Sequence, residues 1–161
     1  MEKKLNWLKQ ISEVAGISGF ETPVKQLLID KLAHQYEVNY DKLGSVIFSR
    51  KEQKDLKVML AAHMDEVGFM VKTITKEGFL KFVTIGGWWE QILLGQRVDV
   101  LTSNGVIPGV IGSKPPHILS PDERKKLVQK ADMYIDIGAK DDKEALEVFG
   151  VKPGCAVVPY S

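Results

Sequence analysis

Residues 58–68 read Val-Met-Leu-Ala-Ala-His-Met-Asp-Glu-Val-Gly, and this stretch says most about both fold and function. Its apolar first half, Val58–Ala62, has the length and composition of a buried strand. His63 follows at once, and Asp65 comes two residues later. Because side chains alternate along an extended chain, His63 and Asp65 are expected to point to the same side. The end of a strand is where α/β proteins bind ligands, and a carboxylate there can orient a metal-ligating imidazole.

The triplet alone is a weak signal, because a histidine at a strand end is also common as a hydrogen-bonded structural residue. A catalytic zinc takes about three protein ligands and a water. The chain has three histidines, His34, His63 and His117, and one cysteine, Cys155. Since there is no HExxH motif, a complete metal site would have to use carboxylates. His34, late in an expected helix, is interpreted as a solvated surface residue.

Composition narrows the class of protein. Hydrophobic residues make up 44% of the chain, which is enough for a folded core. The 22 basic and 21 acidic residues give a formal net charge of +1, which argues against nucleic acid as the main partner. One cysteine fits a reducing compartment, and the chain shows neither a signal peptide nor an apolar run near the ~20 residues of a membrane span. We therefore expect a cytoplasmic protein without a membrane partner.

The first part of the chain has an α/β pattern. Apolar residues at helical spacing predict amphipathic helices over 5–14 and 24–32, the second with Thr22 as N-cap. Strands are expected over 37–40 and 45–48, and a charged loop, Arg50–Asp55, then leads to the buried strand. These elements make only a thin core, so this part is expected to be an incomplete α/β layer.

After residue 66 the pattern changes to short strands. A capping box at Ser120 predicts a helix to about residue 130. The remaining expected elements are two hairpins, two further strands and a short helix: 69–74 with 79–84, 97–101 with 106–111, 133–137, 157–160, and 142–149. Such a series predicts a small, partly open β-barrel over residues 67–161.

Five blocks of sequence, taken in order, resemble one family. They are Ser18-Gly19-Phe20-Glu21, Ala62-His63-Met64-Asp65-Glu66-Val67-Gly68-Phe69, Ile85-Gly86-Gly87-Trp88, Gly109-Val110-Ile111-Gly112-Ser113-Lys114-Pro115-Pro116-His117 and Ile135-Asp136-Ile137-Gly138-Ala139. Together they look like the N-terminal part of the glutamyl-aminopeptidase or tetrahedral-aminopeptidase family of dinuclear metallopeptidases. Some members of that family are labelled endoglucanases.

The resemblance implies an architecture and a set of roles. A catalytic α/β domain of the phosphorylase/hydrolase-like kind, here residues 1–66, would be interrupted by a PDZ-like β-barrel, here 67–161, that mediates self-association. His63 matches a metal ligand, and Asp65 matches the active-site carboxylate that orients its imidazole. For His117, in a Pro-Pro-His loop, two interpretations stay open: a contact to the peptide substrate, or a structural role in the turn.

The same resemblance implies two divalent ions, zinc or cobalt, in the intact enzyme. Only His63 of the family's ligand set maps onto this chain, so residues 1–161 alone are expected to bind at most a single ion weakly and to be inactive. Two alternatives stay open. Residues 67–160 could be a non-enzymatic self-association or peptide-binding module, and the endoglucanase label suggests a glycoside hydrolase, although we find no pair of carboxylates to support it.

Two further features are interpreted as structural rather than functional. The pair Trp88-Trp89 is expected to be a packing corner rather than a ligand platform. Cys155, in Pro-Gly-Cys, stands where the family usually has aspartate, and it is interpreted as a turn residue because no neighbouring base is suggested.

Overall fold

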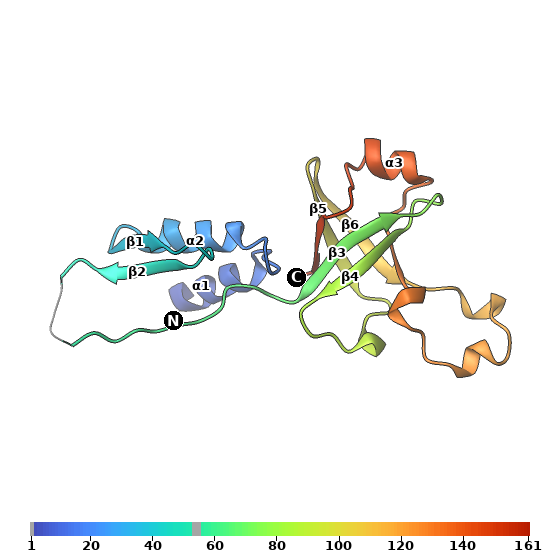
Figure 1. The fold of residues 1–161 in the computed structure, drawn as a ribbon, viewed down its shortest axis with the longest axis horizontal. Helices are drawn as coiled ribbons and strands as arrows, with labels where there is room; N and C mark the ends of the chain where they lie inside the picture. Colours follow the sequence, from blue (N-terminus) through green and yellow to red (C-terminus); the bar gives the residue numbers. More distant parts are fainter. Residues whose placement is uncertain (1, 53–55) are drawn as a thin grey trace. The chain divides into compact units, whose positions relative to one another are not determined.

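A computed structural model of the chain describes residues 2–52 and 56–161, so the last three residues of the predicted charged loop lie outside the described residues. The chain forms two compact units that divide between Glu66 and Val67. The first unit holds two helices and a hairpin (Figure 1): α1 (Glu2–Glu13), α2 (Thr22–Leu32), β1 (Tyr36–Tyr40) and β2 (Val46–Arg50).

Local chemistry explains most of this first unit. Pro23 lies in the first turn of α2, where a missing N–H costs nothing. The predicted cap at Thr22 is wrong: Thr22 is already helical, and Glu21 precedes the helix without capping it by a side-chain hydrogen bond. The Glu21 carboxylate instead accepts a hydrogen bond from the Gly19 N–H at 2.8 Å, so it stabilises the loop before the helix.

The β1–β2 hairpin is held by its turn. The Asp41 carboxylate accepts hydrogen bonds from the backbone N–H of Leu43 at 2.9 Å and of Ser45 at 2.8 Å. The Ser45 hydroxyl donates to the same carboxylate at 2.7 Å. These hydrogen bonds, with the Ser45 side chain first, hold the pKa of Asp41 below its ordinary value.

The prediction of a buried strand at Val58–Ala62 is wrong for this structure. Residues 58–62 belong to no strand, and Leu60 is 94% exposed. Among the described residues, no backbone hydrogen bond joins this run to another segment. A strand needs a hydrogen-bonded neighbour, and among the residues that the structure describes in this unit, β1 and β2 pair only with each other. The run therefore stays exposed although its composition is that of a core strand.

The second unit is a closed β-barrel in which every neighbouring pair is antiparallel. The order around the barrel is β3-β4-β7-β6-β5-β8. The strands are β3 (Gly68–Ile74), β4 (Leu80–Ile85), β5 (Arg97–Thr102), β6 (Gly105–Gly112), β7 (Tyr134–Asp136) and β8 (Ala156–Pro159). The predicted barrel is thus correct, but it is closed rather than partly open, because Val157 of β8 pairs with both Phe69 of β3 and Val100 of β5.

The barrel core follows from alternation along these strands. In β3, Phe69 and Val71 are buried and point inward, and the same holds for Leu80 and Phe82 in β4. The Phe69 ring meets Phe82 edge to face, with centroids 5.2 Å apart. Trp88 stacks on the other side, 4.7 Å from Phe69, and its indole N–H donates to the Gly68 carbonyl at 3.0 Å. Trp88 is therefore the packing corner that the sequence predicted, whereas Trp89 is 71% exposed.

The helical segments of the barrel unit are short. α3 (Asp142–Glu147) begins with a real cap, because the Asp141 carboxylate accepts a hydrogen bond from the Glu144 N–H at 2.8 Å. Four single 3₁₀ turns complete the unit: Glu90–Ile92, Pro116–Ile118, Glu123–Lys125 and Lys130–Asp132.

The predicted helix over 120–130 is wrong, since this stretch contains only the 3₁₀ turn at 123–125 and the first residue of the one at 130–132. Its capping box is nevertheless made: Ser120 N–H donates to Glu123 at 2.8 Å, and Glu123 N–H donates to the Ser120 hydroxyl at 3.3 Å. A capping box stabilises only the first turn of a helix. The segment that follows has no buried face whose packing would extend the helix.

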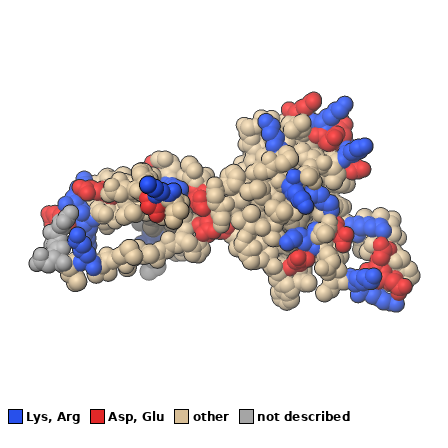
Figure 2. Space-filling model, viewed as in Figure 1, with Lys and Arg blue, Asp and Glu red and all other residues tan. Residues whose placement is uncertain are grey.

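The distribution of charge on the surface agrees with the formal net charge of +1. On the face of residues 67–161 drawn in Figure 2, Lys and Arg side chains are interspersed with Asp and Glu. Within the described residues, no helix has both the length and the apolar character needed to cross a membrane.

Candidate functional site

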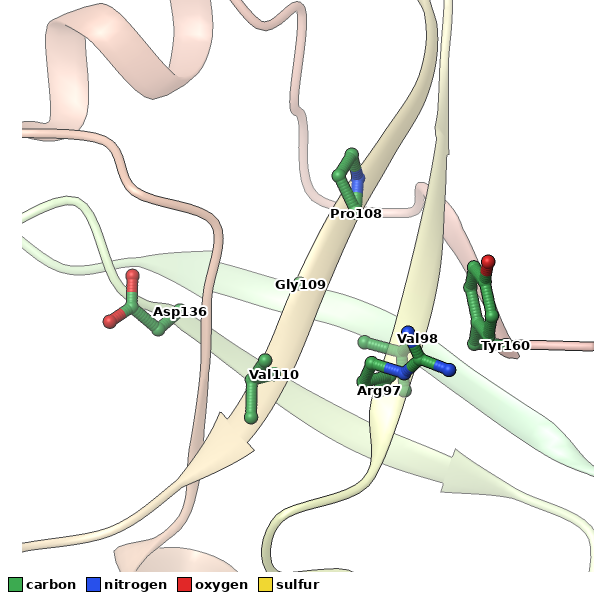
Figure 3. A pocket seen from close by; sticks show the side chains of 7 residues that line it. All are labelled: Arg97, Val98, Pro108, Gly109, Val110, Asp136 and Tyr160. Atoms are coloured by element: carbon green, nitrogen blue, oxygen red, sulfur yellow. The ribbon is translucent and has the colours of Figure 1, made fainter.

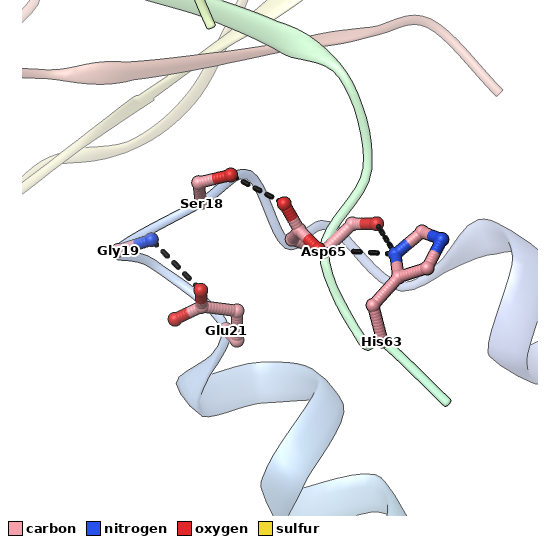
Figure 4. Close-up of polar contacts among 5 residues, drawn as sticks. All are labelled: Ser18, Gly19, Glu21, His63 and Asp65. Atoms are coloured by element: carbon pink, nitrogen blue, oxygen red, sulfur yellow. Dashed lines mark hydrogen bonds and ion pairs between the residues drawn. The ribbon is translucent and has the colours of Figure 1, made fainter. Parts of the chain in front are cut away.

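His63 and Asp65 meet as the alternation of side chains predicts. The His63 Nδ1 lies 3.0 Å from a carboxylate oxygen of Asp65 and 2.9 Å from the Asp65 backbone carbonyl (Figure 4). Both partners only accept hydrogen bonds when Asp65 is ionised, so Nδ1 must carry the proton. The neutral ring then has its free lone pair on Nε2, which points away from Asp65 in Figure 4. The His63 side chain is 85% exposed, so this nitrogen is accessible to a ligand.

Asp65 is held from its other side by Ser18. The Ser18 hydroxyl donates to the second carboxylate oxygen of Asp65 (Figure 4). This hydrogen bond is the main reason, with the one from His63 next, why the pKa of the Asp65 carboxyl lies below its ordinary value. Asp65 is therefore anionic at neutral pH, and an ionised carboxylate accepts the stronger hydrogen bond from an imidazole N–H.

Glu66 is engaged in structure rather than left free for chemistry. Its backbone N–H donates to the Gly16 carbonyl at 2.8 Å, and its carboxylate accepts from the Gly16 N–H at 3.1 Å. Ile17 and Glu66 form a lone parallel bridge. A Cβ on Gly16 would collide with Val24, so only glycine allows this close approach of the loop to α2. The loop at 16–20 and the segment at 63–66 thus form one hydrogen-bonded structure.

The donor set fits a single position of a metal site. His63 offers one oriented imidazole nitrogen, and Asp65 uses both carboxylate oxygens in hydrogen bonds. The described residues contain no group of three or more His, Cys, Asp or Glu side chains able to hold a metal ion. A complete catalytic site needs further ligands from outside this set.

The other candidate residues lie apart from this pair in the sequence. His117 occupies the 3₁₀ turn at 116–118 of the barrel unit, and its side chain is exposed. His34 is exposed and contacts Gln35, which agrees with the surface role expected for it. The Cys155 sulfur accepts a hydrogen bond from the Lys152 N–H at 3.3 Å, which agrees with a turn residue.

The barrel unit carries a shallow concavity of about 460 Å³ (Figure 3). The Arg97 guanidinium lies over the Tyr160 ring at 4.0 Å along its wall. Gly109 lies in its lining, where an added Cβ would meet Ile135 at 2.7 Å. None of the histidines predicted to act in the site lines this concavity, so we do not assign it to the candidate site.

Sequence reasoning found the pair His63 and Asp65 but gave no role to Ser18. Ser18 stands at the start of one family block, 44 residues before the start of the next one. Its contact with Asp65 joins residues 47 positions apart, so no local pattern could have revealed it.

Comparisons with known proteins agree with this fold. The family model of the M42 glutamyl aminopeptidases matches residues 44–161. The putative aminopeptidase FrvX of Escherichia coli K12 is 45% identical over 154 residues, which cover 94% of this chain and 43% of that protein. A TET aminopeptidase structure from Thaumarchaeota archaeon SCGC AB-539-E09 has a TM-score of 0.94 at 49% identity, covering 100% of this chain and 45% of that one.

A third relative is the TET1 peptidase of Pyrococcus horikoshii, which can assemble into a tetrahedron or a large octahedral shell. It has a TM-score of 0.84 at 35% identity, covering 96% of this chain and 46% of that one. The chain therefore belongs to the M42 glutamyl aminopeptidase family. The expected α/β class with a β-barrel is confirmed, and the chain spans less than half the length of the curated relatives it matches.

Proposed function

We propose that residues 1–161 are the N-terminal part of a cytoplasmic, metal-dependent aminopeptidase that removes N-terminal residues from peptides. The observation that carries this proposal is the exposed His63 imidazole, whose Nδ1–H is held by Asp65 so that Nε2 is free to bind a metal. Family membership supports peptide hydrolysis as the reaction.

In this proposal the residues of this chain hold a metal ion and orient its imidazole ligand. His63 is one ligand of a site for two divalent ions, zinc or cobalt, and Asp65 fixes its tautomer and increases its basicity. Such ions, when bound, polarise the scissile carbonyl and supply an activated water. We assign Glu66 a structural role, because its carboxylate accepts a hydrogen bond from the Gly16 N–H.

The exposed run at 58–62 supports the view that this catalytic unit is completed by other residues. Five successive residues of core-strand composition face solvent here. Curated relatives are more than twice as long as the stretch they share with this chain. We propose that further residues of the enzyme supply both the missing strands and the missing metal ligands.

A chimera tests the activity directly. The matching 43% of the E. coli relative is replaced by this chain, and hydrolysis of aminoacyl anilides and of cellulosic substrates is measured with added Zn²⁺ or Co²⁺. We expect anilide hydrolysis that His63→Ala abolishes and Asp65→Asn lowers about 10- to 100-fold. His34→Ala, an exposed histidine of the same unit, is the matched control and should leave activity unchanged.

The same chimera addresses His117. If this exposed histidine contacts the peptide, His117→Ala should raise KM for peptides while the metal content stays constant. Equal KM values would assign His117 to the turn after Pro115 and Pro116. Activity on cellulosic substrates with none on anilides would contradict the aminopeptidase and favour the glycoside hydrolase.

The chain alone is proposed to be inactive, because one imidazole cannot hold two ions. After loading with Zn²⁺ or Co²⁺ and dialysis, intact mass and metal analysis should find fewer than two ions per chain. Two retained ions would mean that carboxylates of residues 1–161 complete the site, and the ligand assignment would be wrong.

Self-association through residues 67–161 is the second proposal, and the shell-forming TET1 relative supports it. Sedimentation of the 161-residue chain should show an oligomer that persists without metal. If the chain forms an oligomer without metal and the chimera hydrolyses neither kind of substrate, the non-enzymatic interaction module would be favoured instead. A monomer across the accessible concentration range would contradict self-association through this unit.

A further inference from the structure

We propose that Ser18 is a positioning residue of the candidate metal site. Its hydroxyl fixes the Asp65 carboxylate, and that carboxylate fixes the tautomer and direction of the His63 ring. The inference rests on the proposed function for what His63 binds, but the positioning itself can be measured in the metal-free chain.

The first argument is the use of both carboxylate oxygens. One Asp65 oxygen accepts from Ser18, and the other lies 3.0 Å from His63 Nδ1. A carboxylate held at one oxygen can still rotate about its Cβ–Cγ bond, and it is then a poorly aligned acceptor. A second hydrogen bond from a hydroxyl stops that rotation, and hydrogen bonds to an ionised acceptor are the stronger kind.

The second argument is that Ser18 is presented by a fixed loop. The preceding Gly16 is bonded to Glu66 through both its N–H and its carbonyl. On the other side, the Phe20 N–H donates to the Ile17 carbonyl at 2.8 Å. Because these hydrogen bonds fix the loop without using the Asp65 side chain, the Ser18 hydroxyl can set the position of the carboxylate rather than follow it.

The third argument sets the size of the effect. His63 Nδ1 has two acceptors, and the Asp65 backbone carbonyl at 2.9 Å remains when Ser18 is changed. Loss of the hydroxyl therefore weakens one of the two contacts that orient the His63 ring, and the other contact remains. A few-fold shift in the tautomer ratio follows from a change of one hydrogen bond, rather than complete loss of the Nδ1–H form.

The test reads the His63 ring nitrogens by ¹⁵N NMR in the metal-free 161-residue chain, at a pH where the imidazole is neutral. We expect mostly Nδ1–H in the wild type, a few-fold rise of the Nε2–H form in Ser18→Ala, and recovery in Ser18→Thr, which keeps the hydroxyl. Ser45→Ala is the matched control, because it removes a serine-to-aspartate hydrogen bond of 2.7 Å from the same unit. It should leave His63 unchanged.

A tautomer ratio that is the same in Ser18→Ala and the wild type would overturn the proposal, and so would an equal shift in Ser45→Ala. In a second measurement, the isotope shift of the Asp65 carboxyl ¹³C signal between H₂O and D₂O, to which the Ser18 hydroxyl and the His63 Nδ1–H both contribute, should be smaller in Ser18→Ala than in the wild type, and an equal isotope shift would also overturn the proposal. Neither readout requires metal or activity, so an inactive chimera would contradict the proposed function alone.

Discussion

The adjacent tryptophans Trp88 and Trp89 allow one prediction to be developed with an internal control. Trp88 is half-buried, stacks on Phe69 at 4.7 Å and donates a hydrogen bond of 3.0 Å to the Gly68 carbonyl. Trp89 is 71% exposed and makes no such contact among the described residues. The substitutions Trp88→Ala and Trp89→Ala remove the same atoms from neighbouring positions, so the difference between them reports the packing and the hydrogen bond of Trp88.

The structure gives the magnitude for Trp88→Ala. Burial of a large apolar side chain contributes about 1.5–3 kcal/mol, and an aromatic pair adds about 0.5–1.5 kcal/mol. A net hydrogen bond contributes about 0.5–1.5 kcal/mol. Because Trp88 is only half-buried, we expect a loss of about 3 kcal/mol, the lower end for Trp→Ala substitutions. Trp89→Ala should lie within about 0.5 kcal/mol of the wild type.

Urea unfolding followed by the amide signals of β3 and β8 reports the stability of the barrel unit itself. A loss of about 3 kcal/mol should lower the melting temperature of a unit of this size by about 12–24 °C. Trp88→Phe keeps a ring on Phe69 and loses the indole N–H, so its cost should be about 1 kcal/mol. Equal losses for Trp88→Ala and Trp89→Ala would refute the packing assigned to this corner.

Three further predictions follow from named contacts. Gly109→Ala should destabilise the barrel by about 1–3 kcal/mol in urea unfolding, because its Cβ would overlap β7, while Gly87→Ala has open space and should be neutral. Hydrogen bonds from Ser120, then Lys114, lower the pKa of Glu123 to about 2. The ionised Glu123 carboxylate therefore stabilises the folded state above its ordinary pKa of 4.5, and this stabilisation is lost as pH falls toward about 2. A ¹³C titration of the Glu123 carboxyl should show this lowered pKa, and Ser120→Ala should raise the titration midpoint. The amide hydrogens of residues 58–62 should exchange without protection, while those of β3 should be protected. Uniform protection would contradict the exposure of residues 58–62.

The sequence by itself determined much of the local structure. Apolar spacing located α1 and α2, and alternation located the paired strands β3 and β4. The turn between β5 and β6 was marked by Asn104-Gly105, where Gly105 has φ +120°. Alternation also placed His63 and Asp65 on one side. Each of these depends on neighbours within a few residues, so the pattern of the chain carries the information.

Tertiary structure decided the rest. The barrel closes because β8 fits between β3 and β5, a pairing of segments far apart in the chain. The run at 58–62 has the composition of a core strand but no backbone hydrogen-bond partner among the described residues, so burial did not follow from composition. Ser18 reaches Asp65 across 47 residues. Hydrogen bonding and burial are properties of the partners a segment finds, and a local pattern specifies only what the segment could pair with.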